Sequence, residues 1–241
     1  LTRTFSLALS EASSGTWPIS ANGTSGIVLG SAAADNIALT GTMGTVDLTG
    51  LTNTLTNTAR TLYGNLTLPA GLTLSSGTSA TTFAATSGTK TITTNGRTLD
   101  FPISFDGLGG TWALQDALTQ GSTRAFTLTN GTVQLQSGTT NTVGSFLTTG
   151  THIKYLQATT PGAQATISQA SGAVNVSYLY IKDSAATGGA TWTAVLPTSA
   201  DQGNNTGWIF TLPNYYWRGG NGVWNASNAT PWSGKIGRAH V

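Results

Sequence analysis

The chain has 241 residues, of which only 7% are charged, and its formal net charge at pH 7 is +2. Ordinary domains carry about 25% charged residues, and nucleic-acid-binding domains cluster Lys and Arg on one face. This sequence contains no Lys/Arg run, so we expect no nucleic-acid partner and no attraction to an anionic membrane. The absence of cysteine excludes disulfides and thiolate metal sites.

The composition favours strands over helices. There are 31 glycines and still more threonines, while the Ala/Glu/Lys/Leu runs that favour helices are missing. Threonine suits a pleated sheet, and Gly and Asn-Gly supply turns. The apolar stretch Phe5–Leu9 is far shorter than a membrane span of about 20 residues, so we expect no membrane insertion.

Alternating apolar residues then predict individual strands along the chain. In residues 65–77, leucines recur at spacing two on either side of a Pro-Ala-Gly turn, and residues 124–138 repeat the pattern around Asn130-Gly131. Such alternation, bounded by Gly, Asn and Ser, is typical of half-buried strands. Residues 111–120 are the best candidate for a short helix, and no window offers a convincing apolar helical stripe.

A weak internal repeat indicates how the strands are arranged. Arg3, Arg60, Arg97 and Arg124 each open a strand-like run, and the intervals between the last three are unequal. Irregular spacing of this kind fits the coils of a β-solenoid, in which stacked Thr and Asn residues form hydrogen-bonded ladders where charges would repel. The fold class is therefore all-β, a solenoid resembling a parallel β-helix; a β-sandwich of jelly-roll type would produce the same alternation and is the alternative.

The C-terminal third changes character. Tyr178–Ile181 is apolar at every position, which predicts a strand covered on both faces. A turn-rich loop follows, then a final strand around Trp208–Phe210 and a break at Pro213.

Two segments of this third carry a family resemblance. VSYLYIKDSAATGGATW at 176–192 and DQGNNTGWIF at 201–210 resemble the closing segment of a β-helical tandem-repeat domain found in environmental phage virion structural and tail-fibre-like proteins and in bacterial surface adhesins. Residues 215–234 resemble the opening of the next unit, with Pro231 in place of the usual Asn. The positions that match this opening are Trp217, Gly219, Gly220, Gly222, Trp224, Trp232 and Ser233.

The last seven residues, KIGRAHV at 235–241, resemble the conceptual translation of a short-read sequencing adapter. Without Lys235 and Arg238 the chain has 8 basic and 8 acidic residues, so its net charge falls to zero. Together with Leu1 in place of an initiator Met, this ending predicts a fragment cut at both ends. The resulting division is a solenoid region at 1–212, the start of a following Trp/Gly-rich unit at 213–234, and an adapter-derived tail at 235–241.

Few residues offer catalytic chemistry. His152 is the only histidine before the tail, and we expect it on a strand facing solvent. Asp100, Asp106 and Asp116 are the only carboxylates close together in sequence, so an enzyme would require them to converge in one groove. Ser104, Asp106 and Trp112 partly match the Asp-box, a structural turn, and we expect Asp106 to be a turn-forming Asx residue.

Aromatic residues provide the remaining candidate site. Sugar-binding surfaces use aromatic platforms, and the candidates for ligand contact are Tyr178, Tyr180, Trp192, Trp217 and Trp224. Packing that seals the end of the solenoid is the simpler explanation for most of these rings.

The sequence thus predicts a non-enzymatic structural or adhesive repeat segment, on a virion or at a cell surface, without cofactor or metal. Its expected partners are neighbouring repeat units of the same chain, and the interpretation also allows cell-surface glycans and a homo-oligomer. A bacterial secreted or surface adhesin is the alternative within this class, and a carbohydrate-active β-helix enzyme is the alternative from another class.

Overall fold

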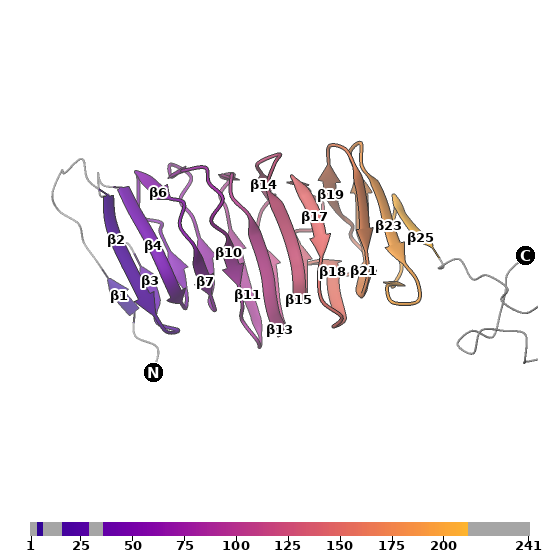
Figure 1. The fold of residues 1–241 in the computed structure, drawn as a ribbon, viewed down its shortest axis with the longest axis horizontal. Helices are drawn as coiled ribbons and strands as arrows, with labels where there is room; N and C mark the ends of the chain where they lie inside the picture. The colour runs from indigo at the N-terminus through magenta and orange to yellow at the C-terminus, as the bar shows by residue number, and fades with distance from the viewer. Residues whose placement is uncertain (1–3, 7–15, 29–35, 212–241) are drawn as a thin grey trace, which may run out of the picture. The chain divides into compact units, whose positions relative to one another are not determined.

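The computed structural model describes residues 4–6, 16–28 and 36–211, and all statements about structure refer to them. These residues form strands and turns and no helix. Every strand pairing is parallel, and each coil lies against the next in chain order, which gives a β-solenoid of about 9 turns (Figure 1). The solenoid prediction is therefore confirmed, and the parallel ladders exclude an antiparallel sandwich.

Most strands belong to one network of parallel pairings. Its 17 strands are β1 (Thr4–Ser6), β2 (Thr16–Asn22), β3 (Gly26–Val28), β4 (Asn36–Met43), β5 (Val46–Asp47), β6 (Thr54–Thr56), β7 (Arg60–Leu62), β8 (Leu66–Thr67), β9 (Thr73–Leu74), β10 (Thr81–Phe83), β11 (Thr89–Thr93), β13 (Ile103–Leu114), β15 (Ala125–Leu135), β17 (Ser145–Thr148), β18 (Lys154–Ala158), β21 (Leu179–Lys182) and β24 (Ala200–Asp201).

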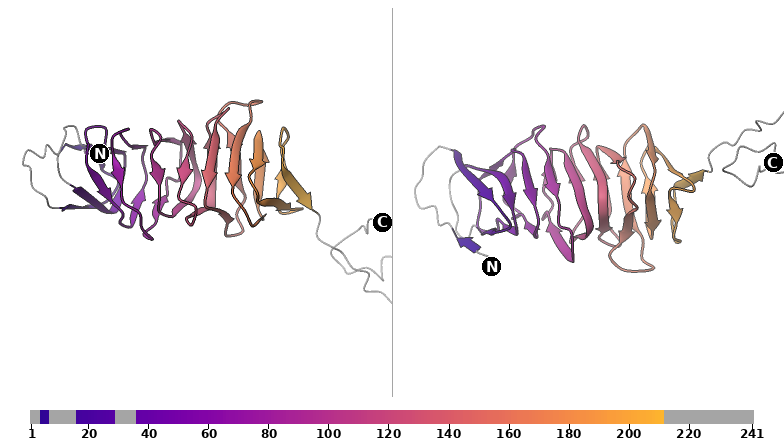
Figure 2. Two further views of the ribbon diagram at one scale, coloured as in Figure 1. Left: turned by 90° about the horizontal axis from the view of Figure 1, so that it is seen from above. Right: turned by 60° about the horizontal axis from the view of Figure 1, so that its bottom comes forward.

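Two smaller sheets complete the later coils, and all three sheets run along the same stack (Figure 2). The five-stranded sheet contains β12 (Thr98–Leu99), β14 (Thr119–Gln120), β16 (Thr140–Val143), β19 (Ala165–Gln169) and β22 (Ser184–Thr187). The three-stranded sheet contains β20 (Ala173–Val176), β23 (Thr191–Val195) and β25 (Trp208–Thr211).

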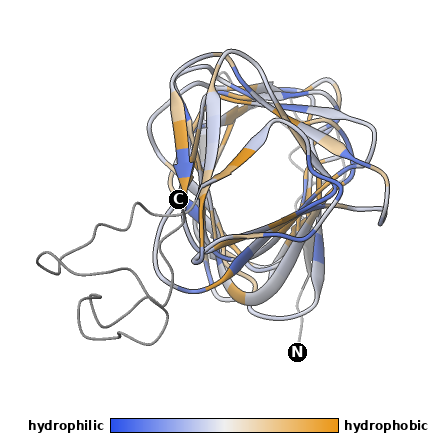
Figure 3. Ribbon diagram, turned by 90° about the vertical axis from the view of Figure 1, so that its right-hand side faces the viewer, coloured by the Kyte–Doolittle hydropathy of each residue, from blue (hydrophilic) through white to orange (hydrophobic). Residues whose placement is uncertain are grey.

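Alternation along each strand separates an apolar interior from a polar exterior. Viewed along the stack, the coils lie over one another around a common interior (Figure 3). Phe126 and Leu128 are fully buried, while Thr127 between them is partly exposed. Because partners in successive coils are in register, each position of a strand generates a column of side chains along the stack.

Aromatic rings fill one such interior column. Phe83, Phe105, Phe126 and Phe146 follow one another with centroid separations of 5.0, 5.1 and 5.5 Å. Trp192 extends the series at 5.9 Å from Phe146. Such offset and tilted pairs add to the stabilisation provided by burial alone.

Residues 111–120 are not helical. Thr111–Leu114 is the end of β13, held between β11 and β15, and Thr119–Gln120 is β14. Trp112 and Leu114 both face the interior at spacing two. Sheet pairing on both sides therefore outweighs the local helix-forming residues.

The arginine repeat does not correspond to the coil repeat. The interval between register partners varies along the stack, and it is much shorter from Trp192 to Trp208 than from Thr140 to Thr166. Arg60 is in register with Gly41 and Thr81, whereas Arg97 precedes β12 in another sheet. The coils are irregular, as predicted, but the arginines do not mark their repeat, and Arg3 lies outside the described residues.

The C-terminal strands are partly as expected. The predicted strand around Trp208–Phe210 is confirmed as β25. In β21, Leu179 and Ile181 are fully buried, but Tyr180 on the other face remains partly exposed. The prediction of cover on both faces was therefore wrong for the outer face. Residues 213–234 and 235–241 lie outside the described part of the chain.

Candidate functional site

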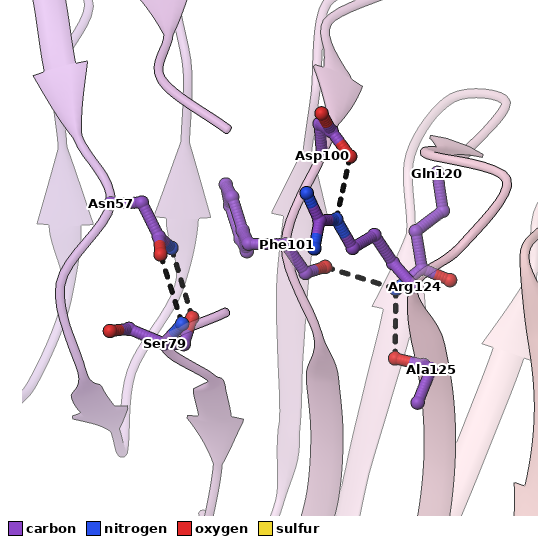
Figure 4. Close-up of polar contacts among 7 residues, drawn as sticks. All are labelled: Asn57, Ser79, Asp100, Phe101, Gln120, Arg124 and Ala125. Carbon is purple, nitrogen blue, oxygen red and sulfur yellow. Dashed lines mark hydrogen bonds and ion pairs between the residues drawn. The ribbon is translucent and has the colours of Figure 1, made fainter. Parts of the chain in front are cut away.

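Hydrogen-bonding side chains mainly link one coil to the next. Asn57 and Ser79 exchange two bonds: the Asn57 amide donates to the Ser79 carbonyl at 2.9 Å, and the Ser79 N–H donates to Asn57 Oδ1 at 3.0 Å (Figure 4). The Gln120 amide nitrogen donates to the carbonyls of Phe101 and Ala125, at 3.1 and 2.9 Å. These polar groups therefore stabilise the stack, and of their side-chain atoms Gln120 Oε1 is left buried without a hydrogen-bond partner.

The three candidate carboxylates have separate partners. Asp100 pairs with Arg124, whose Nε lies 2.7 Å from Asp100 Oδ1 (Figure 4). Asp106 accepts a bond of 2.6 Å from the Asn130 amide. Asp116 accepts from the backbone N–H and hydroxyl of Thr94, at 3.0 and 3.1 Å.

These carboxylates do not form a recognisable catalytic or metal centre. Within the described residues, no three His, Asp or Glu side chains gather as metal ligands would. Asp106 does not form the expected turn. It lies inside the long strand β13, beside a register shift relative to β15, and bonds across to the next coil. In the same strand Ser104 faces outward and Trp112 is buried, so the partial Asp-box match does not mark a turn here.

His152 is exposed, as expected, but does not belong to a strand. It lies in the bend before β18, two residues ahead of Lys154. No nucleophile or carboxylate bonds to it among the described residues.

The aromatic candidates fall into three groups. Tyr178 and Tyr180 are partly exposed; Tyr180 lies on the outer face of β21, and Tyr178 immediately precedes that strand. Trp192 is only 2% exposed, donates its indole N–H to the Thr187 carbonyl at 3.0 Å, and packs in the interior aromatic column. Trp192 therefore belongs to the packing alternative, because its ring faces are covered. Trp217 and Trp224 lie outside the described residues.

A small tyrosine patch remains on the surface of the later coils, formed by Tyr155 and Tyr180. Tyr155 of β18 is in register with Tyr180 of β21, and their rings meet edge to face at 5.6 Å. Tyr155 is 36% exposed. Tyr155 was not predicted as a site residue, because its proximity to Tyr180 depends on the register between coils.

A buried lysine lies beside Tyr178. Lys154 is fully buried, its ammonium donates to the Gly150 carbonyl at 3.2 Å, and it lies 5.7 Å from the centre of the Tyr178 ring. Burial lowers the pKa of Lys154 because the charged form loses its hydration. The cation–ring contact with Lys154 stabilises the position of the Tyr178 ring.

Two columns of uncharged hydroxyl residues run along the exterior. One outward column of successive register partners consists of Thr42, Thr61, Thr82, Ser104 and Thr127. A second column in the five-stranded sheet consists of Thr98, Thr119, Thr142, Ser168 and Thr187. The low charge of the sequence thus corresponds to columns in which like residues stack at the spacing of adjacent strands, about 4.8 Å.

Comparison with known proteins adds no assignment. No protein-family model, no curated protein sequence and no solved structure matches this chain. Within the described residues, no helix is both long enough and apolar enough to cross a membrane.

Proposed function

We propose that this chain is a structural and adhesive repeat segment of a large phage virion or tail-fibre-like protein, in which the solenoid serves as a stalk. The observation that carries the proposal is where the polar side chains lie and which groups they bond to. They form outward hydroxyl ladders or bond between coils, and the candidate carboxylates do not gather at a shared centre.

The ladders support a stalk role for a physical reason. Side chains repeated at every coil stabilise each interface between neighbours in the same way, so the array can be extended by adding coils without a new core. Uncharged hydroxyls suit such columns, because identical charges one strand apart would repel. Enzyme active sites, by contrast, bring reactive and titratable groups together in one pocket.

The tyrosine patch is the surface we propose for recognition of cell-surface glycans. Tyrosine offers an apolar ring face together with a hydroxyl, and Tyr155 is accessible. One pair of rings binds weakly, but copies repeated across an assembly raise the effective affinity by about 10²–10⁴. A bacterial surface adhesin would use the same arrangement, and the neighbouring genes distinguish the two sources.

The first experiment is long-read sequencing through both ends of the reading frame. Further Trp-Gly-Gly units flanked by capsid, portal or tail genes would support the virion proposal. A secretion or cell-wall anchoring domain in the same frame would replace it with the adhesin.

The second experiment tests adhesion directly. The full chain is displayed as a monomer and on multivalent particles, and both forms are incubated with an array of bacterial surface polysaccharides. We expect binding by the particles alone, reduced at least tenfold by Tyr180→Ala and unchanged by Leu108→Ala, which truncates a side chain that is 53% exposed elsewhere. Equal binding by wild type and Tyr180→Ala would refute the patch, and release of reducing ends from a polysaccharide would point to an enzyme.

A further inference from the structure

The interior of the solenoid contains an arginine that lacks a counter-ion. Arg60 opens β7 with its side chain directed inward, in phase with Leu62, and it is only 6% exposed. In the coil on one side its register partner is Gly41, which has no side chain, and in the coil on the other side it is Thr81. The guanidinium group therefore lies among the core residues of neighbouring coils.

The hydrogen-bonding capacity of Arg60 is mostly unused by the protein. Its Nε donates to Thr81 Oγ1 at 2.9 Å, and its guanidinium carbon lies 5.4 Å from the centre of the Phe101 ring. Nη1 and Nη2 are both buried and have no hydrogen-bond partner. The ion pair found among the described residues joins Arg124 to Asp100, so the Arg60 charge is not neutralised by a carboxylate there.

An uncompensated buried cation is energetically costly. A buried charge left without its partner is strongly destabilising, because it has neither water nor a counter-charge. Burial lowers the pKa of Arg60 to about 10, so the group is still a cation at neutral pH. The four N–H bonds on Nη1 and Nη2 therefore need an acceptor, preferably one with negative charge.

The space beside Arg60 limits the size of that acceptor. Arg60 and Thr81 share an interior cavity with apolar side chains that include Leu39, Leu62, Phe83 and Phe101. Its volume is about 20 Å³. A single water requires about 10–15 Å³, so the cavity accommodates one small species and excludes a multi-atom oxyanion such as sulfate or phosphate.

We propose that Arg60 binds a single monatomic anion of the halide class, with chloride from the medium as its ordinary occupant, inside the solenoid. The anion accepts hydrogen bonds from Nη1 and Nη2 and neutralises the buried charge. Apolar walls provide no competing donors, so the site selects for charge and small size. A ligand that binds the folded state alone stabilises it in proportion to the logarithm of its concentration once the site is filled.

The solution test measures thermal unfolding of the full chain at constant ionic strength, with sodium chloride replacing sodium gluconate stepwise. Gluconate is too large for the cavity. We expect the melting temperature of the wild type to rise with chloride, and that of Arg60→Met to be independent of chloride. Arg97→Met is the matched control: Arg97 is partly exposed and does not line the cavity, so its variant keeps the chloride response.

If Arg60→Met does not fold, a crystallographic experiment on the wild type still tests the proposal. Crystals of the wild type grown in sodium bromide should show an anomalous peak within hydrogen-bonding distance of Nη1 and Nη2. A water at that position, with no anomalous signal, would overturn the proposal. A chloride response of the same size in wild type and Arg60→Met would overturn it as well, because the effect would then arise elsewhere.

Discussion

Truncation of Phe126 tests whether the interior aromatic column holds the coils together. The Phe126 ring is fully buried between Phe105 and Phe146, at centroid distances of 5.1 and 5.5 Å. A Phe→Ala change in a core costs about 3–5 kcal/mol, and loss of contact with two rings places this site at the upper end of that range. We therefore expect Phe126→Ala to lower the free energy of unfolding by about 4–5 kcal/mol.

The measurement is urea-induced unfolding followed by circular dichroism and tryptophan fluorescence. Leu147→Ala is the control, because Leu147 lies one residue after Phe146, faces outward and is 46% exposed. Its expected cost is within about 0.5 kcal/mol, as for most surface substitutions. If Phe126→Ala cost no more than Leu147→Ala, the column would not stabilise the stack. A reduced denaturant slope would instead show that the two halves unfold separately.

Three further changes test the packing and charges of individual coils. A Cβ at Gly110 would lie 1.8 Å from the Ala85 carbonyl oxygen, so Gly110→Ala should lower the free energy of unfolding in urea by about 1–3 kcal/mol. Gly71→Ala is the control and should not destabilise the fold, because a Cβ at Gly71 would have no atom within 4 Å. A hydrogen bond from Asn204, assisted by the Gly162 N–H and by Lys182, lowers the pKa of Asp183 below 3.8. Asp183 therefore stabilises the fold above that pH and ceases to do so as pH falls through its folded-state pKa. Asp183→Asn should reduce the pH dependence of the urea unfolding midpoint between pH 2 and 5. An unchanged pH dependence would contradict this assignment. Burial lowers the pKa of Lys154 from 10.5, so the wild type gains stability as pH rises from the folded-state pKa towards 10.5. Lys154→Met should lack this gain and be at least as stable as the wild type at pH 7. A clear loss of stability of Lys154→Met at pH 7 would argue against a net cost of the buried amine.

Much of the fold follows from local sequence patterns. The leucines of residues 65–77 and the apolar residues of 124–138 alternate, and the structure buries nearly all of them. Low charge combined with abundant threonine predicted stacked, hydrogen-bonded columns. Thr61, Thr82 and Ser104 are stacked in register, and the hydroxyl groups of Thr129 and Thr149 are hydrogen-bonded between coils. Alternation and composition are local properties, so they survive in a single sequence without knowledge of the partner coil.

The register between coils could not be predicted in the same way. The coils differ in length, as the partners Trp192 and Trp208 and the partners Thr140 and Thr166 show, so no fixed period identifies a partner. The tyrosine patch depends on this register: Tyr155 meets Tyr180 because the chain between them completes one coil, and no local pattern specifies the length of that coil. The burial of Trp192 could not be predicted for the same reason, because its place in the interior column depends on Phe146 from an earlier coil.

The buried cations were within reach of sequence analysis. Arg60 has the same parity as Leu62, Leu66 and Leu68, and Lys154 the same parity as Leu156, so alternation directs both charged side chains into the core. A charge in phase with apolar residues signals either a strand end or a buried charge that requires a partner. Lys154 finds a carbonyl and the Tyr178 ring, whereas Arg60 retains two unpartnered nitrogens beside a cavity, and this difference makes Arg60 the position where a ligand would change stability.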